Sequence, residues 1–273
     1  MLTFSSFLKK LKISIDFLIK KDKLSNYAFI QLNEHLFYQM THRKNMEFET
    51  IITHNDLDGI VSAAICSYVF GIDRIKFAGP NDIANADITI TSNDIVCDLP
   101  YPLECGLWFD HHEGNLEELR YRNIDANEIP GKFDLKPSCA RVVYDYFREQ
   151  QPLPEYFEEL VRETDIIDSF EYVSLDDWQK ETPAKIIDST IRLQTEQYKQ
   201  KMNYLKKLVF LLRDNPIQQV IQSDEIQERY QYYLQEEQNI LQILRQNSSF
   251  LKQDENQEMI ILDFSGFSRP PRI

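Results

Sequence analysis

The sequence THNDLDG at residues 53–59 decides how this chain is interpreted. It follows a short apolar run at residues 48–53 and precedes small and apolar residues at helical spacing, residues 60–70, with Gly71 as the stop. A strand, a polar turn and a helix in this order form the first unit of an α/β fold. The histidine and the two aspartates of the turn are therefore predicted to lie at a strand end, where such folds bind ligands.

The same alternation of strand and helix continues downstream. Ser138 follows a proline and is predicted to cap a helix. Alternation of this kind predicts a mostly parallel sheet with helices on both faces, here over residues 46–180. The further elements that we predict are strands at residues 74–78, 94–98 and 107–110 and helices at 138–147 and 155–163.

The character of the chain changes after residue 180. Residues 181–256 are rich in Gln and contain no glycine, and apolar residues at helical spacing around 198–212 and 226–244 predict a helical linker region. Residues 259–264 are apolar enough for one more strand, and a single strand needs a sheet to join. We therefore interpret residues 257–273 as the start of a truncated C-terminal domain.

The charge is acidic overall and uneven along the chain. With 44 Asp and Glu against 30 Lys and Arg, the net charge of −14 argues against stable binding of duplex DNA. Residues 1–45 are the exception, with eight Lys and Arg against three Asp and Glu, and form a basic N-terminal extension. This extension lacks the features of a signal peptide. The alternatives are a loosely packed extension and a membrane-surface or partner helix, and we do not expect membrane contact.

The four cysteines show no CxxC spacing, and nothing else in the sequence indicates secretion. We expect reduced, buried thiols in a cytoplasmic protein.

The first candidate site is the 53–59 turn. His54, Asp56 and Asp58 alternate, so an extended backbone would send all three side chains to one face. One imidazole and two carboxylates that converge in this way predict a divalent-metal site. Oxygen ligands suit Mg²⁺ or Mn²⁺, and the imidazole favours a transition metal.

The second candidate site is WFDHHEGN at residues 108–115, where an apolar strand delivers Asp110, His111 and His112 to the same sheet edge. Asp98 ends another predicted strand, and TDIID at residues 164–168 follows a helix. Any one such carboxylate is commonly a cap or a hydrogen-bonded loop residue. Caps and loop hydrogen bonds do not readily explain the whole ordered set, which is HxDxDG, then a spaced aspartate, then DHH, each after an apolar strand.

Together these motifs resemble those of the DHH phosphoesterase superfamily, over roughly residues 47–170. The resemblance implies that His54 and Asp56 hold one Mn²⁺, that Asp58 and His111 hold a second, and that Asp98 bridges them. It also implies a ligand at the fourth motif, for which we favour Asp165 over Asp168. Asp110 is expected to orient His111, and His112 is expected to face the phosphate. We count Asp110 and His112 as catalytic residues.

What the resemblance implies is a two-ion phosphoesterase, with Mn²⁺ as cofactor and Mg²⁺ as the alternative. Two ions can clamp the attacking and leaving oxygens of a displacement at phosphorus, and they also neutralise the substrate's charge. The expected substrates are polyphosphate, short oligonucleotides or nucleotides. Members of the family usually bind substrate through a glycine-rich GGGH-type motif. None of the seven glycines of this chain belongs to such a motif. The alternative is therefore a truncated, catalytically weak module with a metal-binding or regulatory role.

Overall fold

The computed structural model describes residues 48–265 apart from 194–195 and 255–256. The predicted basic extension, residues 1–45, lies outside the described residues, and so does the question of its membrane contact. Residues 266–273 of the predicted C-terminal domain also lie outside them. In the described part of the chain, no helix combines the length and apolar character needed to cross a bilayer.

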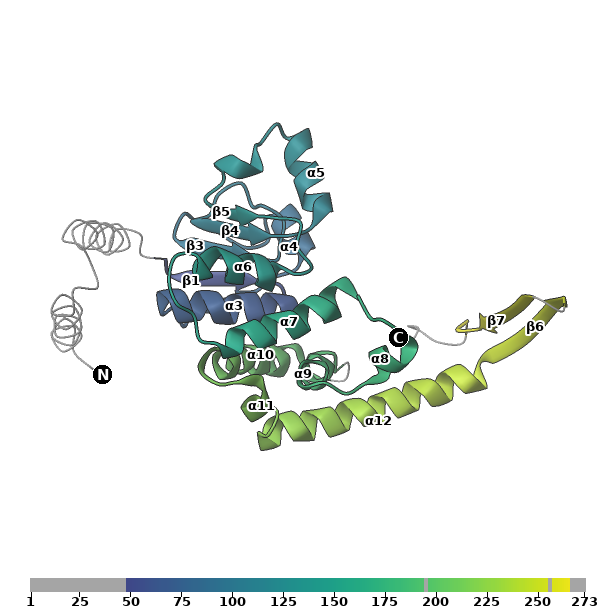
Figure 1. Cartoon of the computed structure of the whole chain (residues 1–273). Coiled ribbons are helices and arrows are strands. Elements are labelled where there is room, and N and C mark those ends of the chain that lie inside the picture. Colours follow the sequence, from purple (N-terminus) through teal and green to yellow (C-terminus); the bar gives the residue numbers. More distant parts are fainter. Residues whose placement is uncertain (1–47, 194–195, 255–256, 266–273) are drawn as a thin grey trace, which may run out of the picture. The chain divides into compact units, whose positions relative to one another are not determined.

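The central element is a five-stranded, all-parallel sheet with the order β2-β1-β3-β4-β5 (Figure 1). This confirms the predicted α/β fold with a parallel sheet. Four strands lie where the sequence predicted them, and β5 was not predicted. The strands are β1 (Thr50–Thr53), β2 (Ile75–Phe77), β3 (Asp94–Cys97), β4 (Leu107–Asp110) and β5 (Gly131–Phe133).

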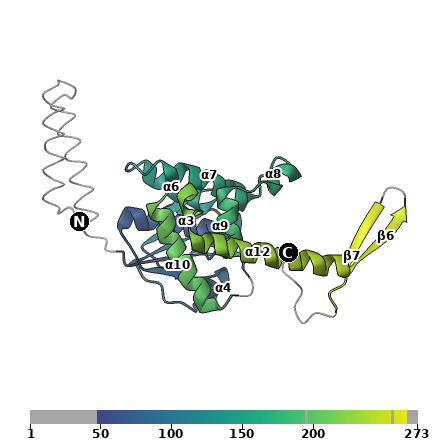
Figure 2. The ribbon, with the colours of Figure 1, turned by 90° about the horizontal axis from the view of Figure 1, so that it is seen from below.

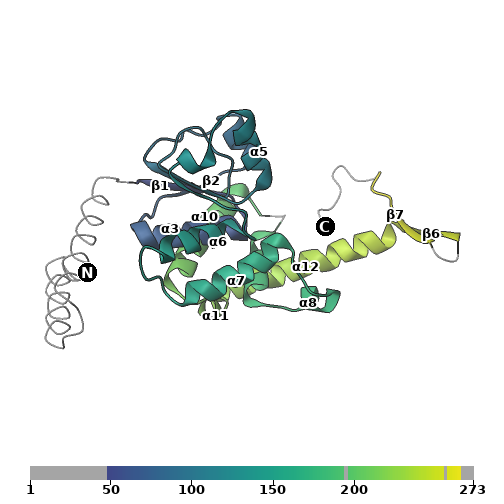
Figure 3. The same cartoon turned by 45° about the horizontal axis from the view of Figure 1, so that its top comes forward.

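Alternate residues of the buried strands face two different hydrophobic layers, as the period of a strand requires. Ile51 and Ile95 pack on the side of α3 (Leu57–Phe70), α6 (Cys139–Arg148), α7 (Tyr156–Ser169) and α10 (Tyr198–Asp214). Ile52 and Val96 face the other side, where Leu119 of α5 (Glu113–Tyr121) and Ile83 of α4 (Pro80–Ala84) contribute. Figure 3 shows α5 on one side of the sheet and α3 and α6 on the other, so helices cover both faces.

The region after α7 is mainly helical, as predicted, but ends in a hairpin. Its helices are α8 (Leu175–Gln179), α9 (Pro183–Ile191), α11 (Ile217–Val220) and the long α12 (Asp224–Gln246), which leads into the hairpin (Figure 2). The hairpin consists of antiparallel β6 (Ser248–Asp254) and β7 (Gln257–Leu262). The strand predicted at residues 259–264 corresponds to β7 and pairs with β6. β6 lies within residues 181–256, which were predicted to be helical.

The four cysteines are free thiols, as predicted. Cys66, Cys97 and Cys139 are buried, whereas Cys105 is only half-buried.

The strand order fixes where a ligand site belongs. In the sheet, β2 lies on one side of β1, and β3, β4 and β5 lie on its other side. In open α/β sheets with this order, ligands bind at the carboxyl ends of the strands where the direction of winding changes. That point lies between the ends of β1 and β3, where His54 and Asp98 emerge.

Candidate metal centre and active site

The turn after β1 is held by a side-chain cap and does not continue the extended strand. Helix α3 begins at Leu57, and Asp56 caps it by accepting a hydrogen bond from the Gly59 N–H at 3.0 Å. A side chain at Gly59 would place its Cβ 2.4 Å from the His54 carbonyl oxygen, so only glycine fits here. The prediction of an extended backbone through residues 54–58 is therefore wrong, because the helix starts inside the motif.

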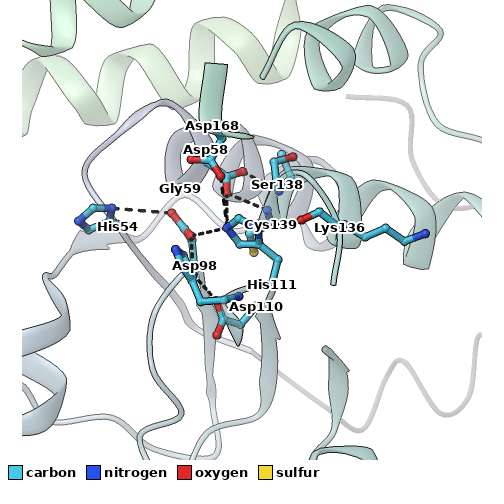
Figure 4. A network of polar contacts seen from close by, with 12 residues as sticks. His54, Asp58, Gly59, Asp98, Asp110, His111, Lys136, Ser138, Cys139 and Asp168 are labelled. Carbon is cyan, nitrogen blue, oxygen red and sulfur yellow. Dashed lines mark hydrogen bonds and ion pairs between the residues drawn. The ribbon is translucent and has the colours of Figure 1, made fainter. Parts of the chain in front are cut away.

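The side chains nevertheless gather at the sheet edge, in three overlapping groups whose ligand atoms lie within 4.8 Å of one another. One group contains His54, Asp56 and Asp98, and a second contains Asp58, His111 and Asp168. The third joins Asp98 with His111 and His112. The residues of the first motif thus divide between two groups, and Asp98 and His111 connect them (Figure 4).

Asp98 occupies the centre of the site in an unusual backbone conformation. Its φ of 58° is left-handed, a conformation that costs a non-glycine residue about 1 kcal/mol or more. Its backbone N–H bonds to the Phe109 carbonyl at 2.9 Å, which ties the turn after β3 to β4. Its carboxylate is buried, and Oδ1 has no hydrogen-bond partner among the described residues.

His111 presents a second buried atom, Nε2, that has no hydrogen-bond partner in the part of the chain that the structure describes. Its Nδ1 lies 3.0 Å from the Lys136 carbonyl oxygen, which only accepts, so Nδ1 carries the proton and Nε2 of the neutral ring has a free lone pair. That lone pair lies among carboxylate oxygens, 3.3 Å from Asp168, 3.5 Å from Asp58 and 3.7 Å from Asp98. So many acceptors facing one point require a cation or protons between them.

Asp110 contacts His112 rather than His111, which corrects the predicted pairing. Its Oδ1 lies 2.9 Å from His112 Nδ1, and its Oδ2 accepts from Asn115 Nδ2 at 2.7 Å. His111 is oriented instead by the Lys136 carbonyl, a backbone group that no side-chain pattern could have indicated. His112 is half exposed, so its ring is accessible from solvent.

Asp58 is held by the first turn of α6, an interaction that the sequence did not indicate. Its two carboxylate oxygens accept hydrogen bonds from the Cys139 and Ala140 N–H groups, each at 2.7 Å. The predicted cap of this helix is confirmed, since Ser138 Oγ accepts from the Arg141 N–H at 3.0 Å. The cap was recognisable from the sequence, but its role in supporting Asp58 was not.

The two carboxylates of the fourth motif have different surroundings. Asp168 Oδ2 lies 3.3 Å from His111 Nε2 and belongs to the second group. Asp165 belongs to none of the three groups and forms an ion pair with Arg141 and a hydrogen bond with Ser138. The structure thus brings Asp168, the less favoured alternative, to the site and places Asp165, the favoured one, outside these groups.

Burial dominates the electrostatics of the site. It raises the pKa of Asp98 and of Asp58 well above the usual carboxyl range, and the neighbouring carboxylates raise both pKa values further. Burial likewise raises the pKa of Asp168. The hydrogen bond that His54 donates to Asp56 raises the pKa of His54, and the one that His112 donates to Asp110 raises the pKa of His112. In the absence of a cation, the site therefore retains protons.

This residue set fits a divalent cation. Carboxylate oxygens and imidazole nitrogens are the ligands of Mn²⁺ and related ions, and the unpartnered Asp98 Oδ1 and His111 Nε2 are positioned for one. His111 is already held through its other ring nitrogen by the Lys136 carbonyl, an arrangement common for metal-ligating histidines.

Adding Mn²⁺ is expected to stabilise the chain more at higher pH. Because the folded pKa values of Asp58 and Asp98 are raised, the cation-free protein loses stability as pH rises above about 4, and bound metal reverses this loss. At 100 times its Kd, one ion adds about 2.7 kcal/mol, or roughly 5–10 °C in Tm. Thermal unfolding at pH 5.5 and pH 8 with and without Mn²⁺ measures this, and an equal gain at both pH values would contradict it.

Comparisons with known proteins agree with this architecture. The pGpG-specific phosphodiesterase PggH from Vibrio cholerae superimposes with a TM-score of 0.62 at 22% identity, over 81% of this chain and 70% of PggH. An uncharacterized protein from Helicobacter pylori G27 reaches only 0.39 at 12% identity, over 77% of this chain and 73% of its own, too low to support an argument. No family model and no curated protein matches the sequence. The chain therefore shares the fold of a phosphodiesterase.

Proposed function

We propose that this protein is a divalent-metal-dependent phosphoesterase of the DHH type that hydrolyses a phosphodiester bond in a short oligonucleotide. The observation that carries the proposal is the pair of buried, unpartnered atoms, Asp98 Oδ1 and His111 Nε2, where three His and Asp groups meet. Structural proteins have no need to bury ionisable groups without partners, because such burial is costly.

The ligand groups support two cation positions. His54, Asp56 and Asp98 would hold one ion, and Asp58, His111 and Asp168 the other. Asp98 also lies 3.7 Å from His111 Nε2 of the second group. At the fourth motif we assign the ligand role to Asp168 instead of Asp165. When bound, such ions polarise the phosphoryl group and lower the pKa of a coordinated water. His112, accessible and oriented by Asp110, is placed to donate a hydrogen bond to a substrate phosphate.

A linear dinucleotide is the substrate class that we favour over polyphosphate. The support is the fold shared with PggH, a phosphodiesterase specific for pGpG. Mn²⁺ remains our proposed cofactor, with Mg²⁺ as the alternative.

The test uses the full chain, stripped with chelator and supplied with Mn²⁺ or Mg²⁺. We expect metal-dependent release of GMP from pGpG, measured by chromatography, and much slower release of phosphate from polyphosphate. Faster hydrolysis of polyphosphate would contradict the substrate class. Tight metal binding without turnover of either would favour a metal-binding or regulatory module.

Replacing His112 by alanine is expected to lower kcat for pGpG roughly 10²–10⁴-fold if its ring donates to the reacting phosphate, with little change in Mn²⁺ affinity. His112 also belongs to the third ligand group, so a ligand role is the competing interpretation. Turnover and Mn²⁺ titration of the same variant separate the two. Equal losses of turnover and of metal affinity would make His112 a ligand.

A further inference from the structure

We propose that Asp165 and Arg141 are positioning residues, which hold the first turn of α6 against Asp58 and thereby maintain the metal position formed by Asp58, His111 and Asp168. This inference deepens the proposed function and rests on its second metal position. It assigns a role to a carboxylate and a guanidinium that lie outside the ligand groups.

The contacts of Asp165 form a closed network with the start of α6. Its Oδ2 accepts two hydrogen bonds from Arg141, from Nε at 2.9 Å and from Nη2 at 2.7 Å. Its Oδ1 accepts from Ser138 Oγ at 2.7 Å. Ser138 Oγ in turn accepts the Arg141 N–H at 3.0 Å, so Arg141 is bound through both its backbone and its side chain.

These contacts also explain why Asp165 is not suited to hold the ion. Both of its oxygens are already bound, and the neighbouring guanidinium neutralises its charge. The Asp165 and Arg141 side chains are only 15% and 17% exposed, so little solvent screens this pair. Two hydrogen bonds from one guanidinium to a single carboxylate oxygen fix geometry as well as charge.

The network reaches the metal site through two peptide groups. The Cys139 and Ala140 N–H groups directly follow Ser138, and each binds one oxygen of Asp58 at 2.7 Å. Asp58 belongs to one ligand group only, with His111 and Asp168. A displaced α6 start would therefore move Asp58 and weaken one of the two metal positions. The position formed by His54, Asp56 and Asp98 has no direct contact with this network in the described structure.

The chain offers a matched control in Arg229 and Glu196. This ion pair likewise has two charge-assisted hydrogen bonds, at 2.8 and 2.6 Å, here one to each carboxylate oxygen, and both side chains are 12% exposed. It joins α12 to the segment after α9 and contacts no ligand group. Loss of either pair removes a partly buried ion pair, but only loss of the Asp165 pair is expected to weaken metal binding.

The experiment is calorimetric titration of Mn²⁺ into the chelator-stripped full chain. Asp165→Ala is expected to weaken one of two binding events roughly 10–100-fold, the usual size of such indirect effects, and to leave the other unchanged. Asp165→Asn, which keeps the shape, and Arg141→Lys, which keeps the charge but loses the paired Nε and Nη2 hydrogen bonds, should weaken the same event less. Glu196→Ala should lower Tm without changing either affinity.

Wild-type affinities at both positions in a folded Asp165→Ala chain would overturn the inference, as would equal weakening of both positions or a similar loss in Glu196→Ala. A wild-type chain that binds no Mn²⁺ would overturn it together with the metal site. The titration measures binding and does not depend on turnover. A chain that binds two ions but hydrolyses no pGpG would therefore contradict the proposed function, while the Mn²⁺ affinities of the variants would still test the positioning role of Asp165 and Arg141.

Discussion

Replacing Asp98 by asparagine is expected to lower metal-dependent turnover roughly 10³-fold while leaving the metal-free fold at least as stable as the wild type. Asp98 lies in both the first and the third ligand group, so its loss affects the whole site. A metal site supplies several kcal/mol of transition-state stabilisation, and each 1.36 kcal/mol corresponds to a factor of about ten in rate.

The expected gain in stability has a separate cause. Burial and neighbouring carboxylates raise the pKa of Asp98, so the preference of this carboxyl group for the charged form at neutral pH, which the unfolded chain satisfies, destabilises the cation-free fold. Asparagine removes that charge and tolerates the left-handed backbone at this position. Turnover of pGpG and metal-free Tm are measured on one preparation. Near-normal turnover would remove Asp98 from the site, and a lower metal-free Tm would show that its role is structural.

Replacing Asp168 by asparagine is expected to lower turnover roughly 10²–10³-fold even at saturating Mn²⁺, whereas Asp165→Asn recovers most of its turnover when Mn²⁺ is raised. The reason is the different placement of the two carboxylates, since Asp168 Oδ2 lies 3.3 Å from His111 Nε2 and Asp165 is bound to Arg141 and Ser138.

The measurement is kcat for pGpG as a function of Mn²⁺ concentration in both variants. Each removes one carboxylate charge from the same helix three residues apart, so each serves as the control for the other. If Asp165→Asn lost turnover irreversibly and Asp168→Asn did not, the ligand at the fourth motif would be Asp165, as the sequence favoured.

The sequence predicted the fold well where local pattern and topology agree. The runs before His54, Asp98 and Asp110 are apolar and end in polar turns, so their placement at one sheet edge followed from the parallel α/β architecture. The pairing of His111 with the Lys136 carbonyl was not predictable, because it joins residues 25 positions apart through a backbone oxygen.

The choice between Asp165 and Asp168 also exceeded what the sequence holds. Both lie on α7, and only the packing of α7 against α6 decides which of them meets His111 and which meets Arg141. Similarly, Asp56 and Asp58 were expected in an extended segment. The cap interaction between Asp56 and Gly59 starts the helix early and sends these two carboxylates to different groups.

We propose above all that cations bind where Asp98 Oδ1 and His111 Nε2, both without a hydrogen-bond partner among the described residues, face each other. Anomalous diffraction at the manganese edge, from crystals of the stripped and reloaded full chain, locates such ions directly. We predict two peaks, one bounded by His54, Asp56 and Asp98 and the other by Asp58, His111 and Asp168. Manganese bound elsewhere, with no peak beside Asp98 and His111, would contradict the account.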